Sequence, residues 1–461
     1  MILPEAFDTY TRQLMGETLY SRYQQALDED APVSIRINPL KMRGDESWGD
    51  AHSGSFSVSD TASARVPWCA EGRYLTARPS FTFDPLFHAG LYYVQEASSM
   101  FVSYILQQLV HSPVTMLDLC AAPGGKTTAA RAVLPSGSLL VANEPMKVRA
   151  SILSENVQKW GHIDIMVTNN LPADYRRCGL NFDVILADVP CSGEGMFRKD
   201  SGALQEWSVQ NVEKCHTLQQ SIIRDIWPCL KPGGLLIYST CTFNAREDED
   251  NVSWIAQELG AEPVYVPVDA SWGITGALTG SLPVYRFIPG KSRGEGLFMA
   301  VLRKTGVASA DQLRSRRVAS GAGHLVSECS ASWLDGDFEC VERGKNVMAV
   351  PRRWLTAYHK LSSLRVLLAG VLLGEMKGKD LVPDESLALS VALKPEAFPR
   401  VELDFAKAIS YLHREPVELP ADTPRGYVLV CYQGHPLGFE KNIGNRCNNL
   451  YPKEWKIRKN M

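Results

Sequence analysis

Two cysteines follow predicted strands at positions where their thiols could act together. Cys191 lies in an Asp-Val-Pro-Cys-Ser-Gly run that begins at Asp188, directly after the strand expected over 182–187. Cys241 lies in a Ser-Thr-Cys-Thr run after the strand expected over 234–238. The carboxyl ends of neighbouring parallel strands border the same cleft. We therefore expect both thiols to converge there, where a thiolate can act as a nucleophile.

A run of small residues follows the first predicted strand, 114–119. It reads Asp-Leu-Cys-Ala-Ala-Pro-Gly-Gly-Lys-Thr from Asp118 and leads into a helix. Small residues let the backbone approach a ligand, and free amides at a helix start favour an anionic group. One alternative is a phosphate-binding P-loop, but Cys120 stands where that motif requires its first glycine, and Pro123 constrains the loop.

The second predicted strand ends at Glu144, 26 residues after Asp118. An acidic side chain at such a position can accept hydrogen bonds from both hydroxyls of a ribose. A glutamate at a strand end can also serve only as a helix cap. Together with the glycine loop, Glu144 indicates an adenosine-containing cofactor.

The elements that would position these residues alternate regularly along the chain. Short apolar runs at 114–119, 138–142, 163–167, 182–187 and 234–238 are separated by helical periods. This pattern predicts an α/β fold with a mostly parallel, doubly wound sheet covered by helices on both faces. Ligands of such sheets bind beyond the carboxyl ends of the strands, and every motif above falls at such an end.

The flanking segments have a different character. The N-terminal part predicts a helix over 5–23, a strand over 33–37 and a Ser/Gly-rich loop over 43–64. Beyond 304, the sequence predicts an amphipathic segment at 357–368, a turn at Gly374, a helix over 405–412 and a strand over 427–432. We expect a small α+β domain over 1–90, the α/β core over 91–304, a small mixed linker domain over 305–390 and a β-rich domain over 391–461.

Composition and charge exclude several classes. The 461 residues contain 45% hydrophobic and 21% charged residues, with no apolar run long enough for a membrane span. The N-terminus shows no secretory signal, so we expect a cytoplasmic protein. The cysteines form no Cys-x-x-Cys pair, so no metal site is expected.

The formal net charge of −3 hides a basic tail. Residues 440–461 hold six basic and two acidic residues, with Tyr451 and Trp455 among them. Such mixtures suit phosphate contact and base stacking in nucleic-acid binding. The alternative is an ordinary solvated face.

Together, the motifs that begin at Asp118, Asp188 and Ser239 resemble those of the RNA cytosine-5 methyltransferases of the Nol1/Nop2/Sun family. The segments 194–200 and 426–451 resemble the bacterial RsmF branch, which modifies small-subunit ribosomal RNA and carries a C-terminal PUA-like domain. The resemblance implies a Rossmann-like methyltransferase core with RNA-contacting domains at both ends.

The resemblance also implies roles for particular residues. Cys241 would be the nucleophile that adds to C6 of cytosine, Cys191 would help to release the product, and Asp188 would lie between cofactor and target base. S-adenosyl-L-methionine would be the cofactor, and Asp188 would be among its contacts. The other cofactor-binding residues would be Cys120, Ala121, Ala122, Pro123, Gly124, Gly125, Lys126, Glu144 and Asn170.

Asn170 enters because this chain departs from the family pattern. Relatives usually place an aspartate after the third strand, near the adenine, and here the stretch reads Thr-Asn-Asn-Leu-Pro from Thr168, so that either Asn169 or Asn170 would take its place. A second departure is Gly290, where relatives often carry a histidine. A third segment, 95–99, matches the family before the first strand, and it could also simply cap the helix that follows.

Alternatives from other classes remain. A DNA cytosine methyltransferase would use Cys191 itself as the nucleophile, and a non-catalytic ribosome-assembly factor would have lost part of these motifs. Within the family, transfer RNA is the alternative substrate. We expect 16S ribosomal RNA or the small ribosomal subunit as the partner, with no membrane or metal involved, and a monomeric protein.

Overall fold

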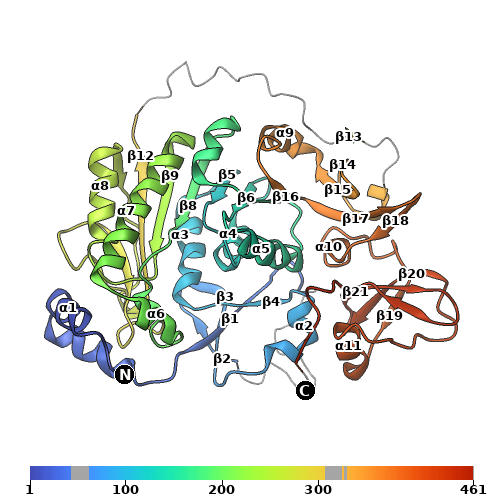
Figure 1. The fold of residues 1–461 in the computed structure, drawn as a ribbon, viewed down its shortest axis with the longest axis horizontal. Coiled ribbons are helices and arrows are strands. Elements are labelled where there is room, and N and C mark those ends of the chain that lie inside the picture. The colour runs from blue at the N-terminus through green and yellow to red at the C-terminus, as the bar shows by residue number, and fades with distance from the viewer. Residues whose placement is uncertain (43–61, 307–323, 326–329, 460–461) are drawn as a thin grey trace.

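A nine-stranded sheet lies at the centre of the molecule (Figure 1). The computed structural model describes residues 1–42, 62–306, 324–325 and 330–459. The five parallel strands are those that the apolar runs predict: β5 (Thr115–Asp118), β6 (Leu139–Asn143), β7 (Ile165–Thr168), β8 (Phe182–Asp188) and β9 (Leu230–Thr240). Three antiparallel strands extend the sheet beyond β9: β10 (Ala261–Pro263), β11 (Val284–Phe287) and β12 (Leu297–Lys304).

The order of the strands places a ligand site at one edge of this sheet. From one side it runs β10-β12-β9-β8-β5-β6-β7. The chain moves outward from β5 through β6 to β7, and then returns to build β8 and β9 on the other side of β5. The carboxyl ends of β5 and β8 therefore border the switch point, where such sheets bind ligands. The predicted doubly wound α/β fold is confirmed.

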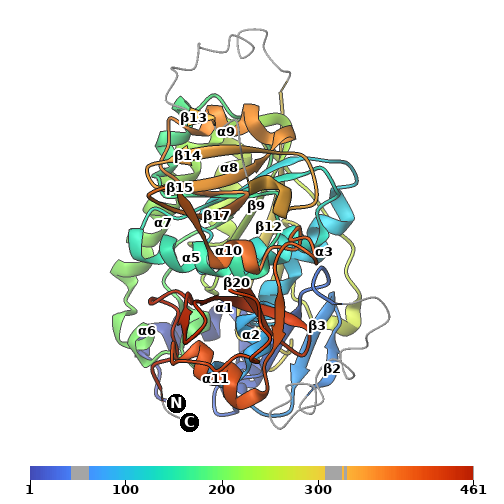
Figure 2. The ribbon, with the colours of Figure 1, turned by 90° about the vertical axis from the view of Figure 1, so that its right-hand side faces the viewer.

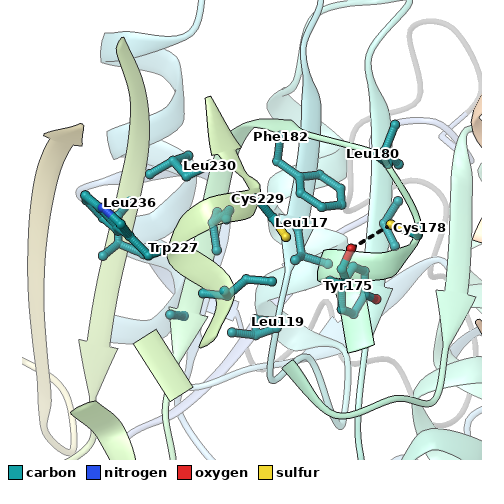
Figure 3. Close-up of a cluster of buried hydrophobic side chains, with 14 of the residues drawn as sticks. Leu117, Leu119, Tyr175, Cys178, Leu180, Phe182, Trp227, Cys229, Leu230 and Leu236 are labelled. Carbon is teal, nitrogen blue, oxygen red and sulfur yellow. Dashed lines mark hydrogen bonds between the residues drawn. The ribbon is translucent and has the colours of Figure 1, made fainter. Parts of the chain in front are cut away.

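Helices cover both faces of the sheet. One face packs against α3 (Phe101–Leu109), α4 (Gly125–Val133) and α5 (Lys147–Trp160). The opposite face packs against α7 (Val209–Ile226) and α8 (Glu249–Glu258). Figure 3 shows part of this second core, where Leu117 and Phe182 of the sheet lie near Cys229, and Trp227 at the end of α7 lies beside Leu236.

The N-terminal region contributes a long helix and a small sheet. The helix is α1 (Glu5–Ala26), and the sheet is ordered β2-β3-β1-β4, with β1 (Val33–Ile37), β2 (Ala62–Val66), β3 (Cys69–Leu75) and β4 (Tyr92–Val94). The predicted helix and β1 are confirmed. The predicted loop over 43–64 was wrong for 62–64, which pair with β3, and 43–61 lie outside the described residues. Phe7 and Tyr23 of α1 pack against Phe243, near the ends of the central strands.

A second small sheet follows the central core. It is ordered β13-β14-β15-β17-β18, with β13 (His324–Leu325), β14 (Phe338–Arg343), β15 (Asn346–Pro351), β17 (Val371–Lys377) and β18 (Asp380–Pro383). The amphipathic segment divides into α9 (Leu355–Leu361) and β16 (Val366–Ala369), and β16 pairs with β7 as the outer strand of the central sheet. The predicted turn at Gly374 was wrong, because Gly374 lies inside β17, where a Cβ would come within 2.1 Å of the Val382 carbonyl oxygen.

The C-terminal region forms a third small sheet, which lies beside the second (Figures 1 and 2). It is ordered β19-β20-β21-β22, with β19 (Arg400–Glu402), β20 (Gly426–Tyr432), β21 (His435–Asn442) and β22 (Cys447–Asn449). The predicted helix is α11 (Phe405–Leu412), and α10 (Glu385–Ala388) precedes this region. No helix among the described residues is long and apolar enough to cross a membrane.

Candidate active site

The two cysteines that the sequence singles out lie in contact. Their Sγ atoms are 3.1 Å apart, and the backbone amide of Cys241 donates to the Cys191 sulfur at 3.3 Å. The contact arises because β8 and β9 are parallel neighbours, with Asp188 paired to Ser239. Both are free thiols.

Two buried glutamates hold the loops that carry these thiols. Glu194, in the loop after β8, accepts hydrogen bonds from the backbone amides of Phe243 (2.7 Å) and Asn244 (3.0 Å), in the loop after β9. Glu247 returns the link by accepting from the Ser192 amide at 3.0 Å. Neither glutamate has a role that the sequence predicts, because their partners lie about 50 residues away.

Asp188 ends β8 and lies in a network of charged and polar groups. Its two carboxylate oxygens accept from Lys126 Nζ at 2.8 Å and from Ser239 Oγ at 2.6 Å. Burial alone would lower the pKa of Lys126, but the neighbouring Asp188 carboxylate outweighs burial and raises that pKa. Lys126 therefore carries a positive charge beside the thiols.

The loop after β5 is shaped by glycine and anchored by Asp118. Gly124 has φ +113° and begins α4, in a backbone conformation that few other residues adopt. Asp118 is fully buried and accepts from Thr127 Oγ1 at 2.7 Å through one oxygen. Its other oxygen has no hydrogen-bond partner among the described residues. Burial raises the pKa of Asp118 to about 7.

A second buried polar atom without a partner comes from the N-terminal region. Gln95 follows β4, and its Oε1 accepts from Arg36 Nε at 2.8 Å. Arg36 also donates to Thr128 Oγ1 at 2.6 Å. Because the Gln95 side-chain oxygen faces Arg36, the Gln95 amide nitrogen points away from Arg36. That nitrogen has no acceptor within the described ranges. The predicted capping role in this segment also holds, because Glu96 accepts from the Ser98 amide at 2.9 Å.

Several of the side chains described above line one cavity of about 330 Å³. Its walls include Asp118, the loop from Cys120 to Pro123, Gly125, Lys126, Asp188 and Cys241. Gln95 and Glu96 lie on the same wall. The partnerless atoms of Asp118 and Gln95 provide one hydrogen-bond acceptor and one donor. That pair suits a head group that carries both an ammonium and a carboxylate, as an α-amino acid does.

Three predicted cofactor residues, Gly124, Glu144 and Asn170, are not among the residues that line this cavity. Glu144 is buried and does not line the cavity; it accepts from the Met146 amide at 2.9 Å, and Arg149 covers it at 3.6 Å. Arg149 also donates to the Ala122 carbonyl at 2.9 Å, which ties Glu144 to the glycine loop. Asn170 bonds the backbone of Arg365 through its amide nitrogen (3.2 Å) and oxygen (2.9 Å). In this structure its side chain therefore joins β7 to β16.

The surroundings of two thiols near the cavity raise their pKa values. The hydrogen bond with Cys241, followed by burial, raises the pKa of Cys191 well above its ordinary value. Burial likewise raises the pKa of Cys120. Both are neutral thiols at neutral pH, and neither is activated as a nucleophile. In the described part of the chain, no three His, Cys, Asp or Glu side chains are grouped to hold a metal ion.

Models of known protein families match three segments of this chain. Residues 106–303 match the family described as 16S rRNA methyltransferase RsmB/F. Residues 3–97 match the N-terminal domain of 16S rRNA methyltransferase RsmF, and residues 398–457 match the methyltransferase RsmF PUA domain.

Individual relatives agree. The ribosomal RNA small subunit methyltransferase F of Escherichia coli is 31% identical over 476 residues, which cover 98% of this chain and 96% of the relative. Its counterpart in Enterobacter sp. (strain 638) is 29% identical, with 98% and 96% covered.

Solved structures share the fold. A methyltransferase homolog protein from Pyrococcus horikoshii aligns with a TM-score of 0.54 and 27% identity, over 65% of this chain and 95% of that one. NSun6 from the same organism, solved with SFG, aligns with a TM-score of 0.55 and 20% identity, over 66% and 99%.

The doubly wound sheet, the glycine loop and the family match together define an S-adenosylmethionine-dependent methyltransferase with a C-terminal PUA-like domain. Within that class, the chain belongs to the RsmF family of 16S rRNA methyltransferases.

Proposed function

We propose that this protein transfers a methyl group from S-adenosylmethionine to C5 of a cytosine in 16S ribosomal RNA. One observation carries the proposal: Cys241 lines the same cavity as Asp188, Lys126 and the glycine loop, with Cys191 in contact behind it. The shared name of the full-length relatives favours ribosomal RNA over transfer RNA.

Cys241 would act as the nucleophile. It adds to C6 of the cytosine as a thiolate, which gives C5 the electron density that it needs to accept a methyl group. The positive charge of Lys126 and the thiol of Cys191, 3.1 Å away, both stabilise a negative sulfur at Cys241. Cys191 keeps its own proton, which argues against Cys191 as the attacking group.

Asp188 would hold the target base. Its oxygens are fixed by Lys126 and Ser239, so the carboxylate is oriented before the base arrives. We propose that it accepts a hydrogen bond from the N4 amino group of the cytosine, and that its partner Lys126 offsets the negative charge that develops on the ring as Cys241 adds.

Product release requires a base. After methylation the C5 proton must leave, and the electrons of that C–H bond then expel Cys241 from C6. The hydrogen bond with Cys241 is the largest cause of the raised pKa of Cys191. That bond weakens once the Cys241 sulfur is bonded to carbon. Cys191 then gives its own proton to solvent and, as a thiolate, takes the C5 proton. We assign the release step to Cys191 on this ground.

S-adenosylmethionine supplies an electrophilic methyl group on a sulfonium. We propose that the backbone from Cys120 to Lys126 holds it, with Asp118 and Gln95 at its amino-acid end and Glu144 at its ribose. The partnerless atoms of Asp118 and Gln95 support this fit. Glu144 would contribute after Arg149, which is half-exposed, moves aside. Asn170 would have to give up its bonds to Arg365 to reach an adenine.

The flanking regions would dock the RNA. We propose the division into 1–90, 91–304, 305–390 and 391–461, with the first and last segments contacting RNA. The predicted stacking role of Tyr451 was wrong, because its ring is 1% exposed and packs against Tyr411 and Trp455. The exposed tail cations, among them Lys453, Lys456 and Arg458, remain suited to phosphates.

One experiment tests the function. The purified protein is incubated with labelled S-adenosylmethionine in three separate reactions. Each contains one substrate: a 16S rRNA transcript, small ribosomal subunits or transfer RNA. Bisulfite sequencing then locates protected cytosines. We expect one protected cytosine in ribosomal RNA, and label in transfer RNA alone would contradict the proposal. We also propose that the protein acts as a monomer in the cytoplasm, and light scattering on the same sample tests the monomer.

A further inference from the structure

A groove leads away from the active-site cavity between the N-terminal sheet and the central core. The cavity at Cys241 shares the wall residues Val94, Gln95, Glu96 and Lys199 with a larger cavity of about 700 Å³. The larger cavity shares Asp30, Pro32 and Arg293 with a third, of about 350 Å³. Because neighbouring cavities have wall residues in common, the three lie next to one another along one side of the N-terminal sheet.

Four exposed cations line this groove: Arg78, Lys199, Lys291 and Arg293. They come from three separate segments, after β3, after β8 and between β11 and β12. None of the four forms an ion pair with a described residue. Their charge is therefore available to an anionic ligand that follows the groove.

Acidic side chains balance this charge only partly. Glu96 lies at the junction, but its oxygens already accept from the Ser98 and Ser99 amides and from the Glu295 amide. Glu29 and Asp30 lie along the third cavity. In the larger cavity the cations Arg78, Lys199 and Arg293 outnumber the acidic side chains Asp30 and Glu96.

The walls of this stretch are held firmly. Arg198, next to Lys199, forms a buried ion pair with Glu295 at 2.9 Å and donates to the Ala26 carbonyl at 2.7 Å. The guanidinium of Arg293 lies 4.0 Å from the centre of the Tyr74 ring, and Tyr74 donates to the Arg293 carbonyl at 2.7 Å. The guanidinium of Arg293 and the backbone that carries Lys199 are therefore placed by contacts with neighbouring groups before any ligand arrives.

The far end of the groove explains the unusual glycine at 290. Gly290 has φ +82°, and a Cβ on it would lie 2.3 Å from the carbonyl oxygen of Arg22 in α1. A histidine would not fit here while α1 keeps its position. The exposed cations of this groove, rather than a side chain at position 290, are therefore available for polar contacts with a ligand.

We propose that this groove holds the single-stranded RNA that flanks the target cytosine, with Lys199 and Arg293 each contacting a phosphate. The inference rests on the proposed function. A base can enter the cavity at Cys241 only when it leaves its stack, which costs a few kcal/mol. Phosphate contacts beside the cavity can offset that cost because they form at the same time as the base enters.

The test compares Lys199→Ala/Arg293→Ala with the control Lys214→Ala/Lys379→Ala. Both control lysines are exposed and lie outside the three cavities. Binding of a 16S rRNA transcript is measured from about 50 to 200 mM salt. Each lost phosphate contact lowers the slope of log K against log salt by about 0.7, so the double variant should lose about 1.4. Its KM for RNA should rise at least about fivefold, while kcat and S-adenosylmethionine affinity stay close to wild type.

A charge-keeping variant separates charge from shape. Lys199→Arg/Arg293→Lys should keep a salt slope close to that of the wild type. The groove proposal is overturned if the alanine variant matches the control, or if its loss is confined to S-adenosylmethionine affinity. Failure of the proposed function is distinguishable, because the wild-type protein itself would then leave 16S rRNA unmethylated.

Discussion

The sulfur atoms of Cys191 and Cys241 lie 3.1 Å apart, at the ends of two neighbouring parallel strands. At this separation one thiol can donate a hydrogen bond to the other sulfur. This hydrogen bond and burial raise the pKa of Cys191, so Cys191 stays protonated, and we propose Cys241 as the nucleophile. The pair can thus divide attack and release between two side chains of one chemical type.

Replacing each cysteine with alanine should separate nucleophilic attack from product release. Cys241→Ala should abolish methyl transfer, because no thiolate adds to C6, while S-adenosylmethionine still binds. Cys191→Ala should methylate once and stall as a protein–RNA thioether, because no group removes the C5 proton. Denaturing gels of reactions with RNA and cofactor would show the adduct as a slower band.

Cys447→Ala serves as the control, because Cys447 is a free thiol in the C-terminal sheet. It should behave like the wild type in both assays. An adduct from Cys241→Ala, with none from Cys191→Ala, would reverse the roles and favour the DNA-type mechanism.

Asp118 should make cofactor binding depend on pH. Its pKa is raised to about 7, so the carboxyl is neutral at pH 6 and ionised at pH 8. A cationic amine prefers the ionised form, so affinity for S-adenosylmethionine should fall about tenfold from pH 8 to pH 6. Calorimetry of Asp118→Asn should give weaker binding with little change over this range. A full pH dependence in that variant would assign the titration to another group.

Removing Glu144 should weaken cofactor binding if it holds the ribose. A hydrogen bond to a charged group contributes about 1.5–3 kcal/mol, so Glu144→Ala should lose at least about tenfold in affinity. Glu258→Ala, an exposed change on α8, provides the comparison and should bind normally. Equal affinity in the two variants would leave Glu144 with only its contacts to the Met146 amide and Arg149.

Glu194 should stabilise the fold and the position of Cys241 together. Its buried carboxylate accepts from Phe243, Asn244 and the Trp207 ring nitrogen. Glu194→Ala leaves these donors without an acceptor, so the free energy of unfolding in urea should fall by about 3 kcal/mol or more. The exposed Glu206 offers a matched change, Glu206→Ala, that should alter stability by less than about 0.5 kcal/mol. A stability loss no larger than that of the control would remove Glu194 from the loop-holding role.

The C-terminal cations are best tested one side chain at a time. Deleting 391–461 would expose Leu91 and Tyr92, which pack against Leu412 and Tyr451. The triple variant Lys453→Ala/Lys456→Ala/Arg458→Ala leaves that core intact. It should bind 16S rRNA more weakly, with a shallower salt slope and unchanged S-adenosylmethionine affinity. An unchanged slope would leave the C-terminal sheet as a packing domain.

The sequence alone determined the elements of the core and the residues at their ends. The five parallel strands are short apolar runs separated by helical periods, and this pattern is local, so it could be recognised without tertiary information. The same holds for α11, whose predicted and observed bounds agree. Cys191, Cys241, Asp188 and the glycine loop were found because each directly follows such a run.

Only the tertiary structure decided how distant segments share one site. Glu194 and Glu247 hold loops through partners about 50 residues away, and Gln95 is bonded by Arg36, about 60 residues away. No local sequence pattern marks such pairs. Tyr451 is buried because the C-terminal sheet packs on the N-terminal region, although the polar residues Asn449 and Lys453 lie only two positions away in the sequence. Long-range packing fixes which polar groups are left without partners, and therefore which of them remain free to bind a ligand.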